Sequence, residues 1–147
     1  MKKIIFVTLL SILFGINGYS QDETNTVSYT VSNNPSAKFP DWCAYRISVS
    51  IDYYSGGSPC SAMQTAVIYR DQSYVFNFPV DPANLISTHI SGEAVDPGNP
   101  NSSTGCTFSN LSLTQSQVFN CCCYYGGHTY WTPLGNNTFN IKGHPGI

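Results

Sequence analysis

The chain has 147 residues and a formal net charge of −2, and only 10% of its residues are charged. Nucleic acids and anionic membranes are bound through clustered lysine and arginine, which this composition lacks, so neither class of partner is expected. The length fits one domain that is large enough to bury a real core.

Residues 1–20 have the pattern of an export signal. Two lysines open the segment, an apolar run follows at 4–14, and small residues precede a cleavage point after Ser20. The apolar run is about half the length that a membrane-spanning helix needs. We therefore expect a signal peptide over 1–20 and a secreted or periplasmic single domain over 21–147, with no stable membrane anchor.

Two strands are expected in the first part of this domain. Val27, Tyr29 and Val31 alternate with hydroxyl-bearing residues, which predicts a short strand. From Cys43 to Tyr54 the apolar residues occupy the odd positions and most of the even positions are polar. This period of two predicts a strand with one face in the core and one in water, beginning with an inward cysteine.

The next segments are predicted to form a hairpin. Residues 65–70 and 74–80 are rich in β-branched and aromatic side chains, and Asp71-Gln72 between them suits a tight turn. Cys60 is expected on the loop that precedes them.

Beyond this hairpin, three further features are predicted. Residues 86–90 alternate as a strand, and residues 138–142 form the last one. Between them, residues 96–105 consist mostly of proline, glycine, asparagine and serine, so we expect an exposed loop.

The pair Gly126-Gly127 predicts a two-residue hairpin turn between residues 115–125 and 128–133. The register that follows from this turn would place Cys122 opposite Trp131.

About eight short strands, with turn signals every ten or so residues, predict an all-β fold. We expect an antiparallel β-sandwich of Ig-like or related Greek-key topology, stabilised by disulfides. A small closed β-barrel is the alternative. The sandwich is preferred because Cys43 has to reach the hairpin cysteines across a layer about 10 Å thick.

Six cysteines follow the predicted cleavage point: Cys43, Cys60, Cys106, Cys121, Cys122 and Cys123. An even number in an exported chain predicts three disulfides. Neighbouring cysteines bond only through a distorted peptide, so each member of the triplet is expected to bond one of the other three. Our preferred pairing joins Cys43 to Cys121 or Cys123 and leaves Cys60 and Cys106 to the rest of the triplet.

Metal and catalytic roles are weaker hypotheses. The triplet with His128 resembles a zinc ligand set in composition, but adjacent cysteines of a strand point to opposite faces, so no metal and no cofactor are assigned. A catalytic thiol needs an unpaired cysteine beside a base, and an even count leaves none. The carboxylates lie in no motif that demands an acid–base pair, so no catalytic residue is assigned.

Aromatic side chains around the predicted hairpin are the candidate ligand-binding residues: Tyr124, Tyr125, His128, Tyr130 and Trp131. Large rigid rings beside hydroxyl and amide groups suit sugar faces and protein partners. If the face of Cys121 and Cys123 points inward, Trp131 and Tyr124 stand outward together. The alternative, which we prefer, places Trp131 in the core.

We therefore expect a secreted, non-enzymatic β-sandwich protein that binds a protein or cell-surface partner. Two alternatives stay open. One is a carbohydrate-binding module that uses the surface aromatics. The other is a small secreted hydrolase that uses scattered carboxylates, such as Asp41 and Asp52, together with His128.

Overall fold

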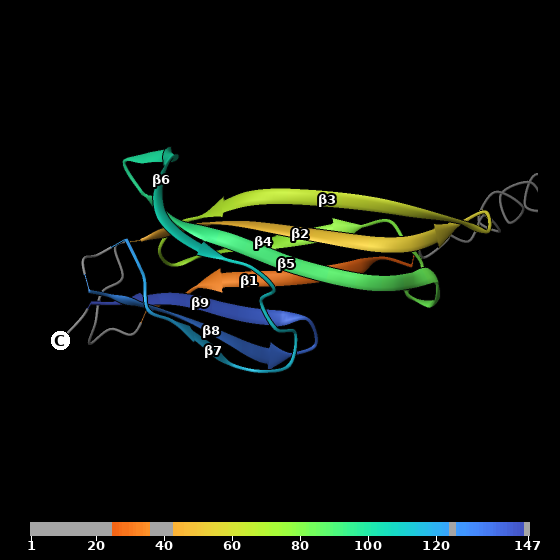
Figure 1. The fold of residues 1–147 in the computed structure, drawn as a ribbon. Helices are drawn as coiled ribbons and strands as arrows, with labels where there is room; N and C mark the ends of the chain where they lie inside the picture. Colours follow the sequence, from red (N-terminus) through yellow and green to blue (C-terminus); the bar gives the residue numbers. More distant parts are fainter. Residues whose placement is uncertain (1–24, 36–42, 124–125, 146–147) are drawn as a thin grey trace, which may run out of the picture.

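The computed structural model describes residues 25–35, 43–123 and 126–145 (Figure 1). These residues form nine strands and one short 3-10 helix: β1 (Val27–Asn33), β2 (Ala44–Ser55), β3 (Ser58–Ile68), β4 (Gln72–Phe78), η1 (Pro82–Asn84), β5 (Leu85–Asp96), β6 (Asn99–Phe108), β7 (Gln117–Phe119), β8 (His128–Gly135) and β9 (Thr138–His144). The expected signal peptide lies outside the described residues.

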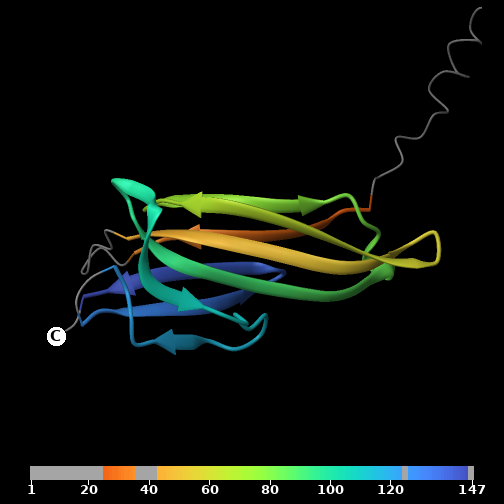
Figure 2. The ribbon, with the colours of Figure 1, turned by 45° about the horizontal axis from the view of Figure 1, so that its top comes forward.

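The nine strands form two separate sheets, so the fold is all-β, as predicted. The five-stranded sheet has the order β4-β1-β9-β8-β7, and the four-stranded sheet has the order β3-β2-β5-β6. Most neighbouring strands are antiparallel, whereas β1 and β9 run parallel to each other. Figure 2 shows that the C-terminal strands, in blue, extend along one side of the body, with β2, β3 and β5 on the other.

Both sheets contribute to one hydrophobic cluster, which includes Tyr29 of β1, Ile47 of β2 and Phe139 of β9. The alternation that predicted β2 is confirmed, because its side chains at positions 45, 47, 49 and 51 are fully buried, while those at 46, 48, 50 and 52 are only partly buried. A strand with this pattern places one face against the other sheet and leaves one face in water.

The predicted hairpin of residues 65–80 is wrong. β3 pairs with β2 over its whole length, and β4 belongs to the other sheet, where it pairs with β1. The turn that decides this pairing is Gly56-Gly57, in which both φ angles are positive. Two such residues make the turn whose twist matches paired strands. Cys60 consequently lies on β3, opposite Tyr53, and not on a loop.

The segment 96–105 is exposed, as expected, but most of it is a strand. β5 continues past its predicted end to Asp96, and after Pro97 and Gly98 the chain returns as β6. The pairing of β5 with β6 is irregular, with register shifts near Val95. Such shifts bend a strand, and a bent strand tolerates a composition that is typical of loops.

The hairpin around Gly126-Gly127 is also corrected. β7 is three residues long and pairs Gln117 with Trp131 and Phe119 with Thr129. The cysteine triplet therefore lies in the connection between β7 and β8 rather than on a strand. Tyr124 and Tyr125 fall outside the described residues.

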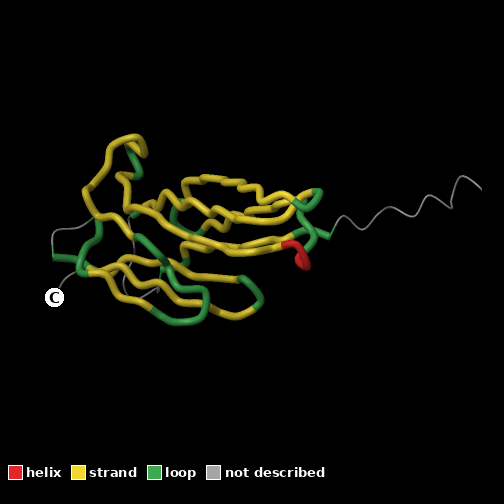
Figure 3. The backbone as a smooth tube through the Cα atoms, turned by 45° about the vertical axis from the view of Figure 1, so that its right-hand side comes forward, coloured by secondary structure: helices red, strands yellow, loops and turns green. Residues whose placement is uncertain are grey.

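The two ends of the body differ. One end carries the cysteine triplet and the start of β2, near the last described residues. The other end, which we call the tip, carries the β2–β3 turn, η1 and the first described residues. Figure 3 shows η1 in red at this tip, and Asn25 donates a hydrogen bond to Asp81 there. Within the described residues, no helix is long and apolar enough to cross a membrane.

Candidate functional site

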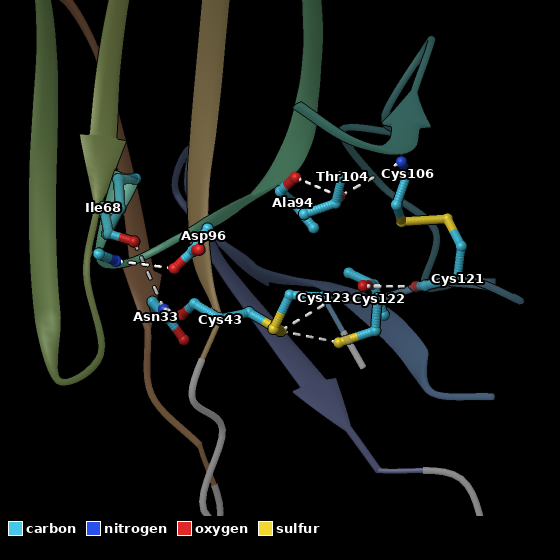
Figure 4. Close-up of a disulfide and its surroundings, with 12 residues drawn as sticks. Asn33, Cys43, Ile68, Ala94, Asp96, Thr104, Cys106, Cys121, Cys122 and Cys123 are labelled. Atoms are coloured by element: carbon cyan, nitrogen blue, oxygen red, sulfur yellow. Dashed lines mark hydrogen bonds between the residues drawn. A yellow bond between two sulfur atoms is a disulfide. The ribbon is translucent and has the colours of Figure 1, made fainter. Parts of the chain in front are cut away.

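The cysteine triplet ties the β7–β8 connection to the four-stranded sheet (Figure 4). Cys123 is bonded to Cys43 at the start of β2, and Cys121 is bonded to Cys106 on β6. The hydroxyl of Thr129 donates to the carbonyl oxygen of Cys121 at 2.8 Å, which fixes the connection to β8 as well. This end of the body is therefore closed by two covalent bonds and a hydrogen bond.

The structure contains two disulfides where three were expected. Cys60 pairs with Tyr53, ten positions along the strand direction from Cys43. At about 3.4 Å per residue this places Cys60 about 30 Å from the triplet. A disulfide requires Cα atoms within about 7 Å of each other, so Cys60 cannot bond to any triplet cysteine within one molecule.

The third triplet cysteine lies against the first disulfide. Cys122 is only 8% exposed, and its Sγ is 2.9 Å from Sγ of Cys43. The sulfurs of Cys43, Cys122 and Cys123 all lie within 4.8 Å of one another. Two of these sulfurs are bonded to each other, and zinc requires thiolates, so the oxidised cluster does not present a zinc ligand set.

Trp131 lies in the core, which was the preferred of its two predicted placements. Its side chain is fully buried and its indole stacks on Phe139, with ring centroids 4.8 Å apart. Its Nε1 donates to the carbonyl oxygen of Ser112 at 2.7 Å, which satisfies the one polar atom of the ring. Trp131 therefore does not reach a surface ligand in this structure.

His128 and Tyr130, the other described members of the predicted set, lie on the outer face of the five-stranded sheet. Tyr130 is opposite Lys142 of β9, and its ring lies 6.1 Å from that of His144. Val118 of β7 stands beside Tyr130 and is 56% exposed. None of these residues lines either of the two pockets described below.

A small pocket of about 200 Å³ lies at the tip. Its lining comes from the end of β2, the β2–β3 turn, the chain after β4 and η1: Tyr53, Tyr54, Ser55, Gly56, Pro79, Val80, Asp81 and Asn84. The side of Tyr53 that faces inward packs on the core, while Tyr54 is 52% exposed. The pocket thus combines the ring of Tyr53, which is fixed by the core, and the accessible ring of Tyr54. Its polar groups, Asp81 and Asn84, come from the segment that connects β4 to β5.

Asp81 is held in place by the residues around it. Its side chain accepts a hydrogen bond from the backbone N–H of Ala83 at 2.9 Å, which caps η1. Its other oxygen accepts from the side chain of Asn25 at 3.2 Å. The exposed residue Asn84 donates its backbone N–H to the carbonyl oxygen of Asp81. These contacts give the polar side of the pocket a defined shape.

The carboxylate of Asp52 is the centre of a separate polar cluster on the outer face of the four-stranded sheet. It accepts hydrogen bonds from the hydroxyls of Ser61 and Ser87 at 2.6 and 2.7 Å. Those bonds, the one from Ser61 first, lower the pKa of Asp52 below its ordinary value. His89 is 3.8 Å from the same carboxylate. The hydroxyl of Ser87 is also 3.4 Å from Nε2 of His89, so one ring nitrogen faces both the serine and the carboxylate. In a nucleophilic triad the two ring nitrogens bind the serine and the carboxylate separately, so this cluster does not have triad geometry.

The residues of the hydrolase hypothesis do not converge. Asp52 is on the outer face of the four-stranded sheet, and His128 is on the outer face of the five-stranded sheet, so the core separates them. Asp41 lies outside the described residues.

A second pocket, of about 170 Å³, lies on the outer face of β2, β5 and β6. Its charged groups already bind each other: Arg46 forms an ion pair with Glu93 and also donates to the carbonyl oxygen of Pro100. Glu93 accepts a further hydrogen bond from Ser103 at 2.8 Å. Because these charges are neutralised within the protein, this pocket is a weaker ligand site than the tip.

No family model matches this chain, and comparisons with curated proteins and with solved structures also find no match. The candidate sites are therefore defined by their own geometry. The sequence predicted a strand that ends at Tyr54, but nothing in it connected this strand end with Asp81 and Asn84. The only local signal was Asp81-Pro82, a pair typical of a helix start.

Proposed function

We propose that the chain is an exported, non-enzymatic binding protein that contacts a protein or cell-surface partner through its tip. The observation that carries this proposal is the exposed ring of Tyr54 beside a pocket shaped by Asp81 and Asn84. The pocket is smaller than the roughly 300–1,000 Å³ typical of sites for drug-sized ligands. It suits one small group, such as a partner side chain or a single sugar ring.

A glycan is the second candidate ligand, and the chemistry of the tip favours it. An exposed tyrosine offers an apolar face for a sugar ring, and a carboxylate with a neighbouring amide accepts and donates hydrogen bonds to sugar hydroxyls. Of the aromatic residues that the sequence suggested for this role, His128 and Tyr130 lie on β8, away from the tip. Substitutions on β8 and at the tip are therefore expected to affect ligand binding differently.

Export and topology are part of the same proposal. The two intrachain disulfides support folding in an oxidising compartment, because cytosolic thiols are kept reduced. The two sheets that share one core support a sandwich. The chain passes from one sheet to the other after β1, β3, β4 and β6, and this repeated crossing supports Greek-key connections.

A pair of tyrosine variants tests the proposal. Labelled protein comprising residues 21–147 is applied to a glycan array and used to capture proteins from intact native cell surfaces. For any ligand recovered, we expect Tyr54→Ala to weaken binding about tenfold, as a contact worth about 1.4 kcal/mol would. Tyr130→Ala, which removes a ring on the other sheet, is expected to leave the affinity unchanged.

The opposite pattern, in which Tyr130→Ala abolishes binding and Tyr54→Ala does not, would move the site to the outer face of β8. If the glycan array shows no bound glycan and repeated capture experiments recover no surface protein, the proposal that this chain is a binding protein is contradicted.

A further inference from the structure

The sulfur of Cys43 contacts the sulfurs of two triplet cysteines, Cys122 and Cys123. It is bonded to Sγ of Cys123 and lies 2.9 Å from Sγ of Cys122. It also accepts a hydrogen bond from the backbone N–H of Cys123 at 3.3 Å. Two adjacent residues of one connection therefore hold their sulfurs against the same partner (Figure 4).

Sulfurs in this arrangement can exchange bonds. A thiolate attacks a disulfide sulfur, a new S–S bond forms, and the displaced sulfur leaves with the electron pair. The reaction requires an attacking sulfur close to the disulfide. Cys122 carries a thiol and already touches the disulfide sulfur of Cys43. No large movement of β2 is needed, because Cys43 is the sulfur that stays in the bond.

We propose that Cys43 alternates between Cys122 and Cys123, and that this exchange makes Cys123 a site of mixed-disulfide formation. In the first step the thiolate of Cys122 attacks Sγ of Cys43. The Cys43–Cys123 bond breaks, and Cys123 leaves as a thiolate that takes up the proton lost by Cys122. The protein holds the same number of disulfides and thiols before and after, so this step needs no oxidant.

The exchange moves the reactive sulfur toward the surface. Cys122 is buried, whereas Cys123 is half-buried. The Cys123 thiolate can then attack an external disulfide of general form R–S–S–R. A Cys123–S–S–R bond forms, and R–S⁻ leaves with the electron pair. The oxidant of this second step is the external disulfide, which we take to be a small molecule.

The rest of the fold confines the exchange to these three sulfurs. Cys121 is committed to Cys106, and its carbonyl oxygen is held by Thr129. Cys60 is on β3 at the tip, about 30 Å away. The second disulfide thus keeps the connection in place while the bond to Cys43 changes partner.

The test uses glutathione disulfide as the probe and a Cys60→Ser background, which removes the remote thiol. After incubation at pH 7.0 and pH 8.5, thiols are alkylated in acid and the adducts are located by tandem mass spectrometry. We expect a glutathione adduct on Cys123 together with a Cys43–Cys122 bond, at a higher rate at pH 8.5 because only the thiolate attacks.

The matched control adds Cys122→Ser, which removes the attacking sulfur and leaves both observed disulfides intact. We expect this variant to lose at least nine-tenths of the adduct on the triplet. In Cys123→Ser, Cys43 is expected to appear in a bond with Cys122 instead of as a thiol.

Two results would overturn the proposal. One is an adduct on Cys122 with the Cys43–Cys123 bond unchanged. The other is no adduct on the triplet under conditions in which Cys60 of the wild-type protein is fully modified. Both are measured without the Cys123→Ser variant, so the test holds even if that variant does not fold.

Discussion

Trp131 is the largest fully buried side chain in the described part of the chain, and its polar atom has a partner in Ser112. Replacing it with alanine removes the stacking on Phe139 and opens a large cavity. We expect Trp131→Ala to lower the free energy of unfolding by about 3–5 kcal/mol, measured by urea denaturation. Val118→Ala, at a site 56% exposed on the next strand, is expected to change it by less than about 0.5 kcal/mol. Similar losses for both variants would contradict this account.

The position of Trp131 shows why a hairpin turn predicted from sequence does not decide which face a side chain occupies. A turn at Gly126-Gly127 would pair Trp131 with Cys122, whereas the structure pairs it with Gln117. The two registers differ by an odd number of residues, and an odd shift exchanges the two faces of a strand. Sequence alone therefore left Trp131 with two possible placements, and only the observed register separates them.

Asp52 allows a prediction about pH. The hydroxyls of Ser61 and Ser87 donate to its carboxylate, so its pKa in the folded protein is lowered from 3.8. The group therefore favours the folded state above pH 3.8, and this contribution is lost as the pH falls through the lowered pKa. We expect Ser61→Ala to raise the pKa of Asp52, measured by NMR titration of its carboxyl carbon.

Ser48→Ala is the matched control for that titration. Ser48 lies on the same outer face but pairs its hydroxyl with Thr65 and not with Asp52. An equal change of the Asp52 pKa in both variants would show that the hydrogen bond from Ser61 is not the cause.

At the scale of elements, the strands with clear alternation were predictable and their partners were not. β1, β2 and β9 follow from apolar residues at every second position, because one face of each meets the core. The pairing of β3 with β2 depended on Gly56-Gly57, which competed with an equally plausible turn at Asp71-Gln72. The tip pocket was beyond prediction for a related reason, since Tyr53 and Asp81 meet only after the chain has crossed between sheets.

A substitution at Gly92 tests how closely β5 and β2 approach each other. A Cβ atom at this position would lie 2.6 Å from Cδ1 of Ile47 and 2.8 Å from the backbone oxygen of Arg46. The backbone oxygen cannot move without disturbing the β2–β5 pairing. We expect Gly92→Ala to cost about 1–3 kcal/mol in thermal or urea unfolding. Gly98→Ala, where the nearest atom is 3.4 Å away, is expected to be tolerated, and an equal loss there would contradict this explanation.

The bond between Cys106 and Cys121 fastens β6 to the β7–β8 connection. It closes a loop with a sequence separation of 15 residues. Constraining a loop of that length in the unfolded chain is worth about 3 kcal/mol. We expect the double variant Cys106→Ala, Cys121→Ala to lose about that much stability in urea, and an unchanged midpoint would show that the bond does not limit unfolding.

On the scale of the whole molecule, the cysteines divide between two ends. Cys60 lies too far from the triplet for an intrachain bond, and it is half-exposed at the tip. We expect Cys60 to react with iodoacetamide in the native protein, and peptide mapping without reductant to find no bond from Cys60 to another residue of the same chain. A Cys60–Cys122 peptide from monomeric protein would contradict the strand pairing of β2 with β3.

The parallel contact of β1 with β9 joins segments more than a hundred residues apart in the chain, at Thr30 and Thr138. Without β9, the strand β1 has only β4 beside it, and the five-stranded sheet is split in two. Long-range contacts of this kind form late and slow the search for the native state. The five-stranded sheet of a nascent chain is therefore incomplete until β9 has left the ribosome, whereas the four-stranded sheet needs only residues up to Phe108.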